Sequence, residues 1–421
     1  MAFLFLATAG AAAATAYAAY ARDRDYTRLV AAGDAGADDH PFEALEAYSG
    51  AIALRPESML AHLKRGRMYR ERGELEAAAR DLRRAAELDP TATLPLELLG
   101  DTYLSMERHD RAAERYAAYL ALDDRAPRVW YKLGLARYRT GAAAAAIPAL
   151  ERALGFESAM AEAHFVLGLC RRDQGDSAGA RASLETATQL SPGLTAPREA
   201  LAGVYADGGD TSRALEQLEA LAALDPGSSI RLVALGAAHS AARRHEAAVL
   251  TLSRAVERFP TDPQVYGALG RVWLGAAEAR HDPVSLKKAL EALTTAATHT
   301  DVSSETLADL GRAWMRSGDL AAAEQVLRQA TTRLPVSPAA YLHLATVSGR
   351  AGRLQEARDA LVNYTVLVDE SVPIAETATR IAAYSLRLGQ PALAVHWIDR
   401  AADETGDTPE LAELRRRARA Q

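Results

Sequence analysis

The stretch MLAHLKRGRMYRERGELEAAARDLRRAAELDPTA, at residues 59–92, is one copy of a unit that recurs along almost the whole chain. A glycine, or once an alanine, returns every 34 residues from Gly66 to Gly270. The positions between them are Gly100, Gly134, Gly168, Ala202 and Gly236. Each follows a leucine except Gly66, which follows Arg65. A period of this length and regularity is typical of a helical solenoid, in which every copy contacts mainly its neighbours.

Each copy is expected to form two helices joined by a short turn. The small residues at Gly66 and Ala78 are predicted to lie where the first and second helices cross closely, because neither carries a long side chain. The larger Leu82 is predicted to fill the space between the helices. Pro90 is expected to end the second helix and set the turn into the next copy.

This pattern resembles the tetratricopeptide repeat, whose unit runs W-x2-L-G-x2-Y, then a small residue, Ala, an apolar residue, Ala and Pro. The resemblance covers about nine tenths of the chain, with about ten copies and a degenerate first one. It implies an all-α fold, a right-handed solenoid of antiparallel helix pairs. It also implies a non-enzymatic platform for protein–protein interaction.

The array divides the chain into four parts. Residues 1–21 form an apolar segment, 22–58 a degenerate first copy, 59–408 the regular array and 409–421 a polar, arginine-rich capping helix. Near residues 278–286 the pattern of the second helix arrives seven residues late. Seven residues make about two helical turns, so both helices of that copy are expected to lengthen by about one turn. The insertion is either a tolerated loop or a protruding hairpin that contacts a partner.

The apolar segment at residues 1–21 contains no charged side chain. Its length is sufficient for a helix that crosses a bilayer. Ala-Tyr-Ala occurs twice near its end and fits a small-x-small cleavage site, although no Lys or Arg precedes it. Three interpretations stay open: an export signal, a retained anchor with Arg22, Arg24 and Arg28 on the cytoplasmic side, or an ordinary alanine-rich helix. We expect a bacterial cell-envelope protein, exported to the periplasm or membrane-anchored, with a cytoplasmic location as the alternative.

Charge and motif content argue against several other classes of protein. The net charge is −6 with both signs interspersed, which does not fit a nucleic-acid binder. No phosphate-binding loop, dinucleotide-binding turn or H-E-x-x-H motif occurs. The single cysteine, Cys170, and the histidines at the family's Trp position, His62 and His164, are predicted to pack structurally. We therefore predict no catalytic residue, no cofactor and no metal site.

Tetratricopeptide arrays usually bind ligands along a concave groove lined by first helices, and the family's groove positions can be carried over to this chain. The groove is expected to centre on residues 64–172 and to prefer an acidic or carboxylate-bearing segment with apolar anchors. Further along, the lining regains charge at Arg271, Arg312 and Arg316. Alternatively, the aromatic residues fill gaps between copies and the arginines form a solvated face. The predicted groove residues are Lys64, Arg67, Arg70, Arg128, Tyr131, Lys132, Tyr138, Arg139, Phe165 and Arg172.

Two classes of function follow from this pattern. In the first, the chain is a scaffold that captures an extended segment of a protein or peptide partner in the groove. In the second, it is a permanent structural subunit whose outer surface is buried in a larger complex, or an adaptor tethered to the membrane through residues 1–21. A chaperone-tail clamp is disfavoured, because such clamps use paired asparagines and this chain has only Asn363.

Overall fold

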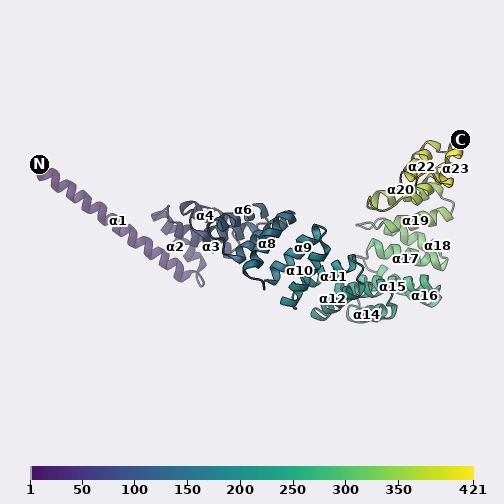
Figure 1. Cartoon of the computed structure of the whole chain (residues 1–421), viewed down its shortest axis with the longest axis horizontal. Coiled ribbons are helices and arrows are strands. Elements are labelled where there is room, and N and C mark those ends of the chain that lie inside the picture. Colours follow the sequence, from purple (N-terminus) through teal and green to yellow (C-terminus); the bar gives the residue numbers. More distant parts are fainter. Residues whose placement is uncertain (1) are drawn as a thin grey trace. The chain divides into compact units, whose positions relative to one another are not determined.

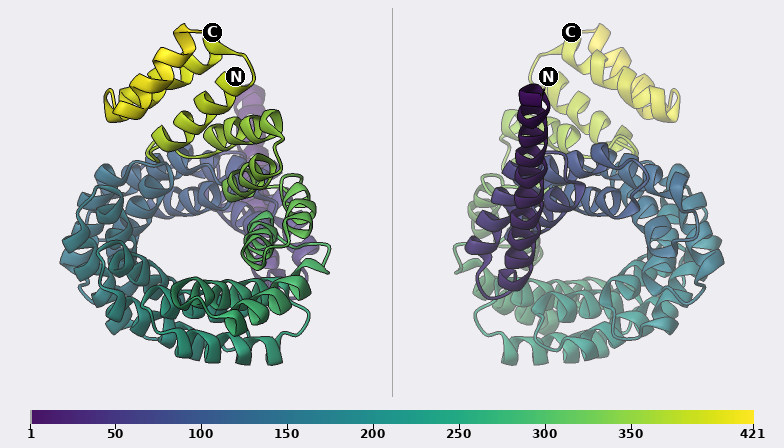
Figure 2. Two further views of the ribbon diagram at one scale, coloured as in Figure 1. Left: turned by 90° about the vertical axis from the view of Figure 1, so that its right-hand side faces the viewer. Right: turned by 90° about the vertical axis from the view of Figure 1, so that its left-hand side faces the viewer.

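The computed structural model describes the backbone of residues 2–421 and the side chains of residues 15–421. Within this part the chain is all-α, with no β-strand (Figure 1). It forms two compact units, one ending at Gly208 and the other spanning Gly209–Gln421. In each unit taken by itself, consecutive helices pack side by side (Figure 2). The predicted helical repeat solenoid is confirmed.

The first unit consists of the following helices. They are α1 (Ala2–Gly36), α2 (Pro41–Leu54), α3 (Met59–Glu71), α4 (Leu75–Leu88), α5 (Thr93–Ser105), α6 (His109–Leu122), α7 (Pro127–Arg139), α8 (Ala143–Phe156), α9 (Ala161–Asp173), α10 (Ser177–Leu190) and α11 (Thr195–Asp207). From α3 onward the odd-numbered members are the first helices of their copies.

The second unit continues the same alternation. Its helices are α12 (Thr211–Leu224), α13 (Ser229–Ala241), α14 (His245–Arg258), α15 (Pro263–Arg280), α16 (Pro283–Ala297), α17 (Ser304–Ser317), α18 (Leu320–Ala330), α19 (Pro338–Arg350), α20 (Leu354–Leu367), α21 (Ala375–Arg387), α22 (Pro391–Thr405) and α23 (Pro409–Arg419). Leu411 and Leu414 of α23 are buried in the apolar cluster that also contains Ile381 and Ile398. The last helix therefore covers the apolar end of the array.

The glycines of the first helices lie at close crossings, as predicted. A Cβ atom added to Gly134 would lie 2.6 Å from Cγ of Leu150, and one added to Gly311 would lie 2.5 Å from Cγ of Leu327. Both leucines are fully buried. The helix pairs of the two units are thus held together by the same contact, in which a large side chain fills the space beside a residue without one.

In several copies the position that the family gives to Trp has a shared hydrogen-bonding role. At this position a side-chain nitrogen lies close to the backbone carbonyl six residues earlier, in the turn between copies. The contacts are His62 Nε2 to Pro56 O at 3.1 Å, Trp130 Nε1 to Asp124 O at 2.8 Å and His164 Nε2 to Ser158 O at 3.0 Å. The structural interpretation of the two histidines agrees with this arrangement.

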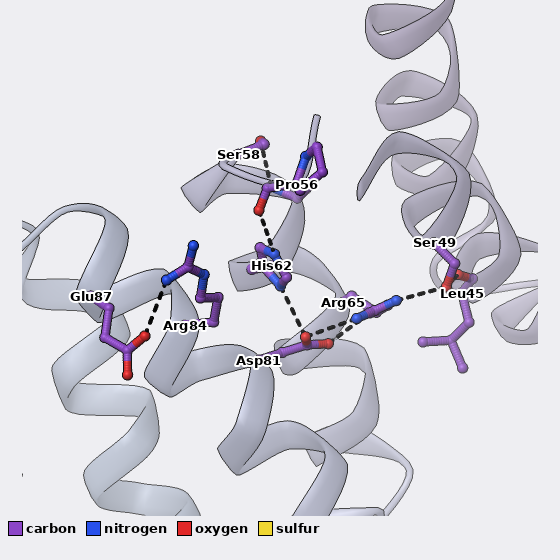
Figure 3. A network of polar contacts seen from close by, with 10 residues as sticks. Leu45, Ser49, Pro56, Ser58, His62, Arg65, Asp81, Arg84 and Glu87 are labelled. Atoms are coloured by element: carbon purple, nitrogen blue, oxygen red, sulfur yellow. Dashed lines mark hydrogen bonds and ion pairs between the residues drawn. The ribbon is translucent and has the colours of Figure 1, made fainter. Parts of the chain in front are cut away.

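The first regular copy contains a buried polar network centred on Asp81 (Figure 3). Arg65 stands in place of the usual leucine, and its guanidinium donates to both carboxylate oxygens of Asp81 at 2.7 and 2.9 Å. The Arg65 guanidinium also donates to Ser49 of α2 at 3.1 Å. His62 Nδ1 lies 3.0 Å from Asp81. The exceptional Arg65 is thus explained by a carboxylate on the paired helix, whose charge it balances inside the fold.

Helix α1 is longer than the degenerate first copy requires. It continues without a break across the predicted boundary between residues 21 and 22. The predicted export signal or anchor at residues 1–21 falls largely on side chains outside the described residues, so its role stays a prediction. In the part of the chain that the structure describes, no helix combines the length and the apolar character needed to cross a membrane.

The seven-residue insertion lengthens mainly one helix. The first helix α15 has 18 residues where α13 has 13, whereas the second helix α16 has 15 where α14 has 14. The prediction of an extra turn in both helices is therefore wrong for α16. The reason is the start signal of α16: Asp282 accepts hydrogen bonds from the backbone N–H groups of Val284 and Ser285, and Pro283 occupies the first turn. The added residues consequently extend α15.

Candidate functional site

The predicted groove residues lie on three first helices of the first unit. Helix α3 carries Lys64, Arg67 and Arg70; α7 carries Arg128, Tyr131, Lys132, Tyr138 and Arg139; α9 carries Phe165 and Arg172. We call the surface that these helices share with α5 the first groove. Its aromatic residues Tyr131, Tyr138 and Phe165 are half-buried against the apolar cluster around Leu150 and Val166. Burial raises the pKa of both tyrosines above the ordinary value. The rings therefore pack between copies, as the alternative interpretation expects.

The cations of the first groove are neutralised by carboxylates that the prediction did not include. Lys132 Nζ lies 2.7 Å from Glu97 and 2.8 Å from Asp101 of α5, and Arg70 lies 3.8 Å from Asp101. Burial opposes the charged form of Lys132, but hydrogen bonds to Asp101 and Glu97 outweigh it and raise the pKa of Lys132. Helix α5 thus places two negative charges between the cations of α3 and α7.

Most remaining cations of the first groove also have a carboxylate nearby. The ion pairs are Lys64–Asp34 at 2.5 Å, Arg67–Glu71 at 2.9 Å, Arg128–Glu162 at 4.0 Å and Arg172–Asp173 at 3.1 Å. Within the described residues, only Arg139 among the predicted cations makes no ion pair. An incoming carboxylate would have to compete with these internal partners for almost every cation of this surface.

The second unit has a cavity of about 450 Å³, lined by its first helices α15, α17, α19 and α21 and by Tyr364 of α20. Four arginines line it, Arg312, Arg316, Arg350 and Arg380, together with two carboxylates, Glu278 and Glu376. Apolar contact area comes from Met315, Leu342 and Tyr364. We call this cavity the arginine pocket. Its lining carries more positive than negative charge, without counting His343, which also lines it.

Two guanidinium groups of the arginine pocket are free of internal partners. Arg316 and Arg350 are exposed, and neither makes an ion pair or side-chain hydrogen bond within the described residues. Arg312 differs, because it lies 3.7 Å from Glu278 and 3.3 Å from Asp309. Two planar cations at the rim of a concave surface can each bind a carboxylate through two parallel hydrogen bonds.

Arg380 and His343 also line the arginine pocket, but unlike Arg316 and Arg350 they interact with neighbouring side chains. Arg380 donates to the Thr346 hydroxyl at a long 3.4 Å. His343 is half-buried, and burial, followed by the positive charge of Arg312, lowers its pKa below the ordinary 6.5. The ring is therefore neutral near pH 7 in the free protein. A carboxylate bound beside it would favour the protonated ring.

The residues of the arginine pocket could have been predicted by applying the family's groove positions to the later copies, as was done for the first groove. Arg312, Met315 and Arg316 hold the same positions in their copy as Leu135, Tyr138 and Arg139 in theirs. The charge at Arg312 and Arg316 was predicted from the sequence, whereas the groove positions of the last two copies were not included in the prediction. Applying them there would have added Leu342, His343, Thr346, Arg350, Glu376 and Arg380.

Cys170 does not have the environment of an activated thiol. Cys170 is fully buried, and burial raises the pKa of its thiol to about 11. Among the described residues, no three His, Cys, Asp or Glu side chains are grouped so that they could hold a metal ion.

The repeated helix pairs define a helical repeat scaffold for protein–protein interaction. The chain belongs to the tetratricopeptide-repeat family. One model of this family matches residues 29–93, 98–160, 144–195 and 308–371, and a second matches residues 171–237 and 205–272. Repeat proteins of this family are in general non-enzymatic interaction scaffolds. No curated protein matches the chain.

Solved structures of several repeat proteins are similar to parts of the chain. YrrB, described as a tetratricopeptide protein with an unusual peptide-binding site, is 24% identical with a TM-score of 0.40, over 45% of this chain and 98% of its own. Yeast Tom70 is 13% identical with a TM-score of 0.48, over 89% of this chain and 99% of its own. The C-terminal part of a repeat protein from Cytophaga hutchinsonii is 18% identical with a TM-score of 0.49, over 56% and 98%.

Proposed function

We propose that the chain is a scaffold that captures an extended acidic segment of a partner protein on the first helices of its second unit, with the arginine pocket as the anchor. The observation that carries this proposal is the pair of unpartnered guanidinium groups, Arg316 and Arg350, at a cavity with a positive lining. Met315, Leu342 and Tyr364 supply apolar area beside them for the anchors of the same segment. Rigid apolar area next to arginine is the combination that dominates the affinity of many interfaces.

The first groove supports this function less well. All of its predicted cations except Arg139 already contact carboxylates, and breaking those ion pairs would offset much of what a new carboxylate contributes. Its aromatic residues are half-buried between copies, which leaves little of their area for a ligand. Binding of a partner segment at residues 64–172 nevertheless stays a prediction, and the experiment below distinguishes the two sites.

The experiment is a titration of a fluorescein-labelled nine-residue peptide of alternating glutamate and leucine, followed by fluorescence anisotropy. The Arg316→Gln/Arg350→Gln variant should bind at least about tenfold more weakly than the wild type, because two charge-assisted contacts are lost. The matched control is Arg67→Gln/Arg172→Gln, which removes the same charge from exposed first-helix positions of the first unit. It should bind within about twofold of the wild type.

Two other outcomes would reject the proposal. If the control loses binding and the pocket variant keeps it, the segment binds in the first groove. If neither variant changes the affinity, and the protein is recovered from cells only in a complex of fixed stoichiometry, the chain is a structural subunit. Circular dichroism of both variants should match the wild type, because all four side chains are exposed.

A location at the bacterial cell envelope is a separate proposal. It is supported by the uncharged apolar residues 1–21 and by Arg22, Arg24 and Arg28 directly after them. Fractionation of cells that express the full chain tests it, with N-terminal sequencing of the recovered protein. A shortened protein in the periplasm indicates an export signal, and a full-length protein in membranes indicates an anchor. A full-length protein in the cytoplasm would contradict the proposal.

A further inference from the structure

A second concave surface of the second unit lies beside the insertion and shares no lining residue with the arginine pocket. A hollow of about 400 Å³ lies between α14, α15 and α16. Its lining residues on α15 are Trp273, Ala276 and Arg280, at positions that the groove pattern does not use. Arg280 is the last residue of α15 and belongs to the part that the insertion adds. We call this hollow the insertion pocket.

The walls of the insertion pocket are mainly apolar. Val249 and Leu250 of α14 line it together with Trp273 and Ala276 of α15. Leu250 is 53% exposed. The Nζ atom of Lys288 lies 4.3 Å from the centroid of the Trp273 ring. A hollow with a tryptophan and exposed aliphatic area is the kind of surface that receives an apolar side chain from a partner.

The rim of the insertion pocket is positively charged. A neighbouring hollow of about 380 Å³ shares Arg280 with it and is also lined by Arg243 and Arg244. These three arginines are exposed, and none makes an ion pair or side-chain hydrogen bond in the described part of the chain. Glu246 is the carboxylate that lines both hollows. The charge around the apolar walls is thus complementary to acidic residues.

We propose that the insertion pocket binds a large apolar side chain of a partner protein segment whose flanking residues are acidic. The hollow accepts the side chain between Leu250 and Trp273, and the arginines of the rim attract the acids beside it. A protein segment is favoured over a bilayer, because the apolar residues line a hollow of about 400 Å³ that can enclose a single side chain. The insertion pocket is a binding site additional to the arginine pocket.

The test uses the Arg316→Gln/Arg350→Gln protein, so that the arginine pocket contributes little. The probe is a fluorescein-labelled nine-residue peptide with one central phenylalanine and four glutamates on each side. Leu250→Glu places a negative charge in the apolar wall and should weaken binding at least about tenfold, while Arg280→Gln should weaken it about threefold and reduce its salt dependence. The matched control is Leu224→Glu, a similarly exposed leucine of a second helix in the same unit, which should leave the affinity unchanged.

Three results would overturn the inference. Equal affinities of the Leu250→Glu and Leu224→Glu proteins would show that the hollow does not hold the phenylalanine. Equal affinity for a control peptide with alanine in place of phenylalanine would show that only charge is recognised. Sedimentation with vesicles containing phosphatidylserine, lost on Leu250→Glu in the absence of peptide binding, would assign the surface to a membrane. The arginine pocket is tested with its own variants, so a negative result for the insertion pocket leaves the proposed function testable.

Discussion

The first groove and the arginine pocket are built from the same positions of the same repeat, yet their charges are arranged differently. In the first groove, Glu97 and Asp101 of α5 lie between the cations of α3 and α7 and pair with Arg70 and Lys132. In the second unit, Arg316 and Arg350 have no such partner within the described residues. The capacity of a repeat surface to bind an acidic segment therefore depends on what the neighbouring copy places beside each arginine.

The largest expected effect is a loss of stability when one of the buried charges of the first unit is removed. Asp81→Ala removes the partner of both Arg65 and His62, and its side chain is only 8% exposed. Loss of one member of a buried ion pair is expected to destabilise α3 and α4 by about 3 kcal/mol. Native-state hydrogen exchange of their amides measures this effect. The double variant Arg65→Leu/Asp81→Ala reproduces the buried residues Leu133 and Ala149 of a later copy and should recover most of the loss.

The helix crossings should behave alike in the two units. Gly134→Ala and Gly311→Ala each place a Cβ atom within 2.6 Å of a buried leucine, so each is expected to cost about 2 kcal/mol. Gly203→Ala is the control, because nothing lies within 4 Å of its added Cβ. That change should stabilise its helix by about 0.5–1 kcal/mol. Urea denaturation compares the three variants, and a large difference between the first two would show that the units are packed differently.

Removal of the α5 carboxylates should make the first groove resemble the arginine pocket. In the Glu97→Gln/Asp101→Asn variant, Lys132 and Arg70 lose their partners and become available to a ligand. With the arginine pocket disabled by Arg316→Gln/Arg350→Gln, the glutamate–leucine peptide should regain affinity by about fivefold, or about 1 kcal/mol. No gain in anisotropy titrations would mean that internal pairing is not what separates the two surfaces.

The smallest expected effect is a pH dependence of the affinity with which the arginine pocket binds an acidic peptide. The pKa of His343 lies below 6.5 in the free protein, and a bound carboxylate would raise it. Binding is then coupled to proton uptake, so affinity should rise about two- to fivefold as the pH falls from about 7 to about 5.5. Above pH 7 it should stay constant. His343→Gln should remove the rise; its persistence in this variant would assign the effect to another group.

Features set within one copy were predicted well from the sequence. The period, the glycine crossings beside residues such as Leu150, and the structural role of His62 and His164 all depend on short-range spacing. Pairing between copies was missed, because Arg70 and Asp101 belong to different helices and meet only when the copies stack. The division of the insertion was also missed, since the cap at Asp282 fixes α16 and directs the added residues into α15. Helix α1 continues across residues 21 and 22, so a change in sequence composition does not have to coincide with the end of a helix.

The most direct test of the central claim is to map where an acidic segment binds on the wild-type chain. The glutamate–leucine peptide, with benzophenone-alanine at its centre, is cross-linked to the protein by light, and the attachment points are identified by mass spectrometry. Cross-links should concentrate on α17, α19 and α21, at residues between Arg312 and Arg380. Cross-links concentrated on α3, α7 and α9, at residues 64–172, would contradict the claim that internally paired cations leave the first groove unavailable.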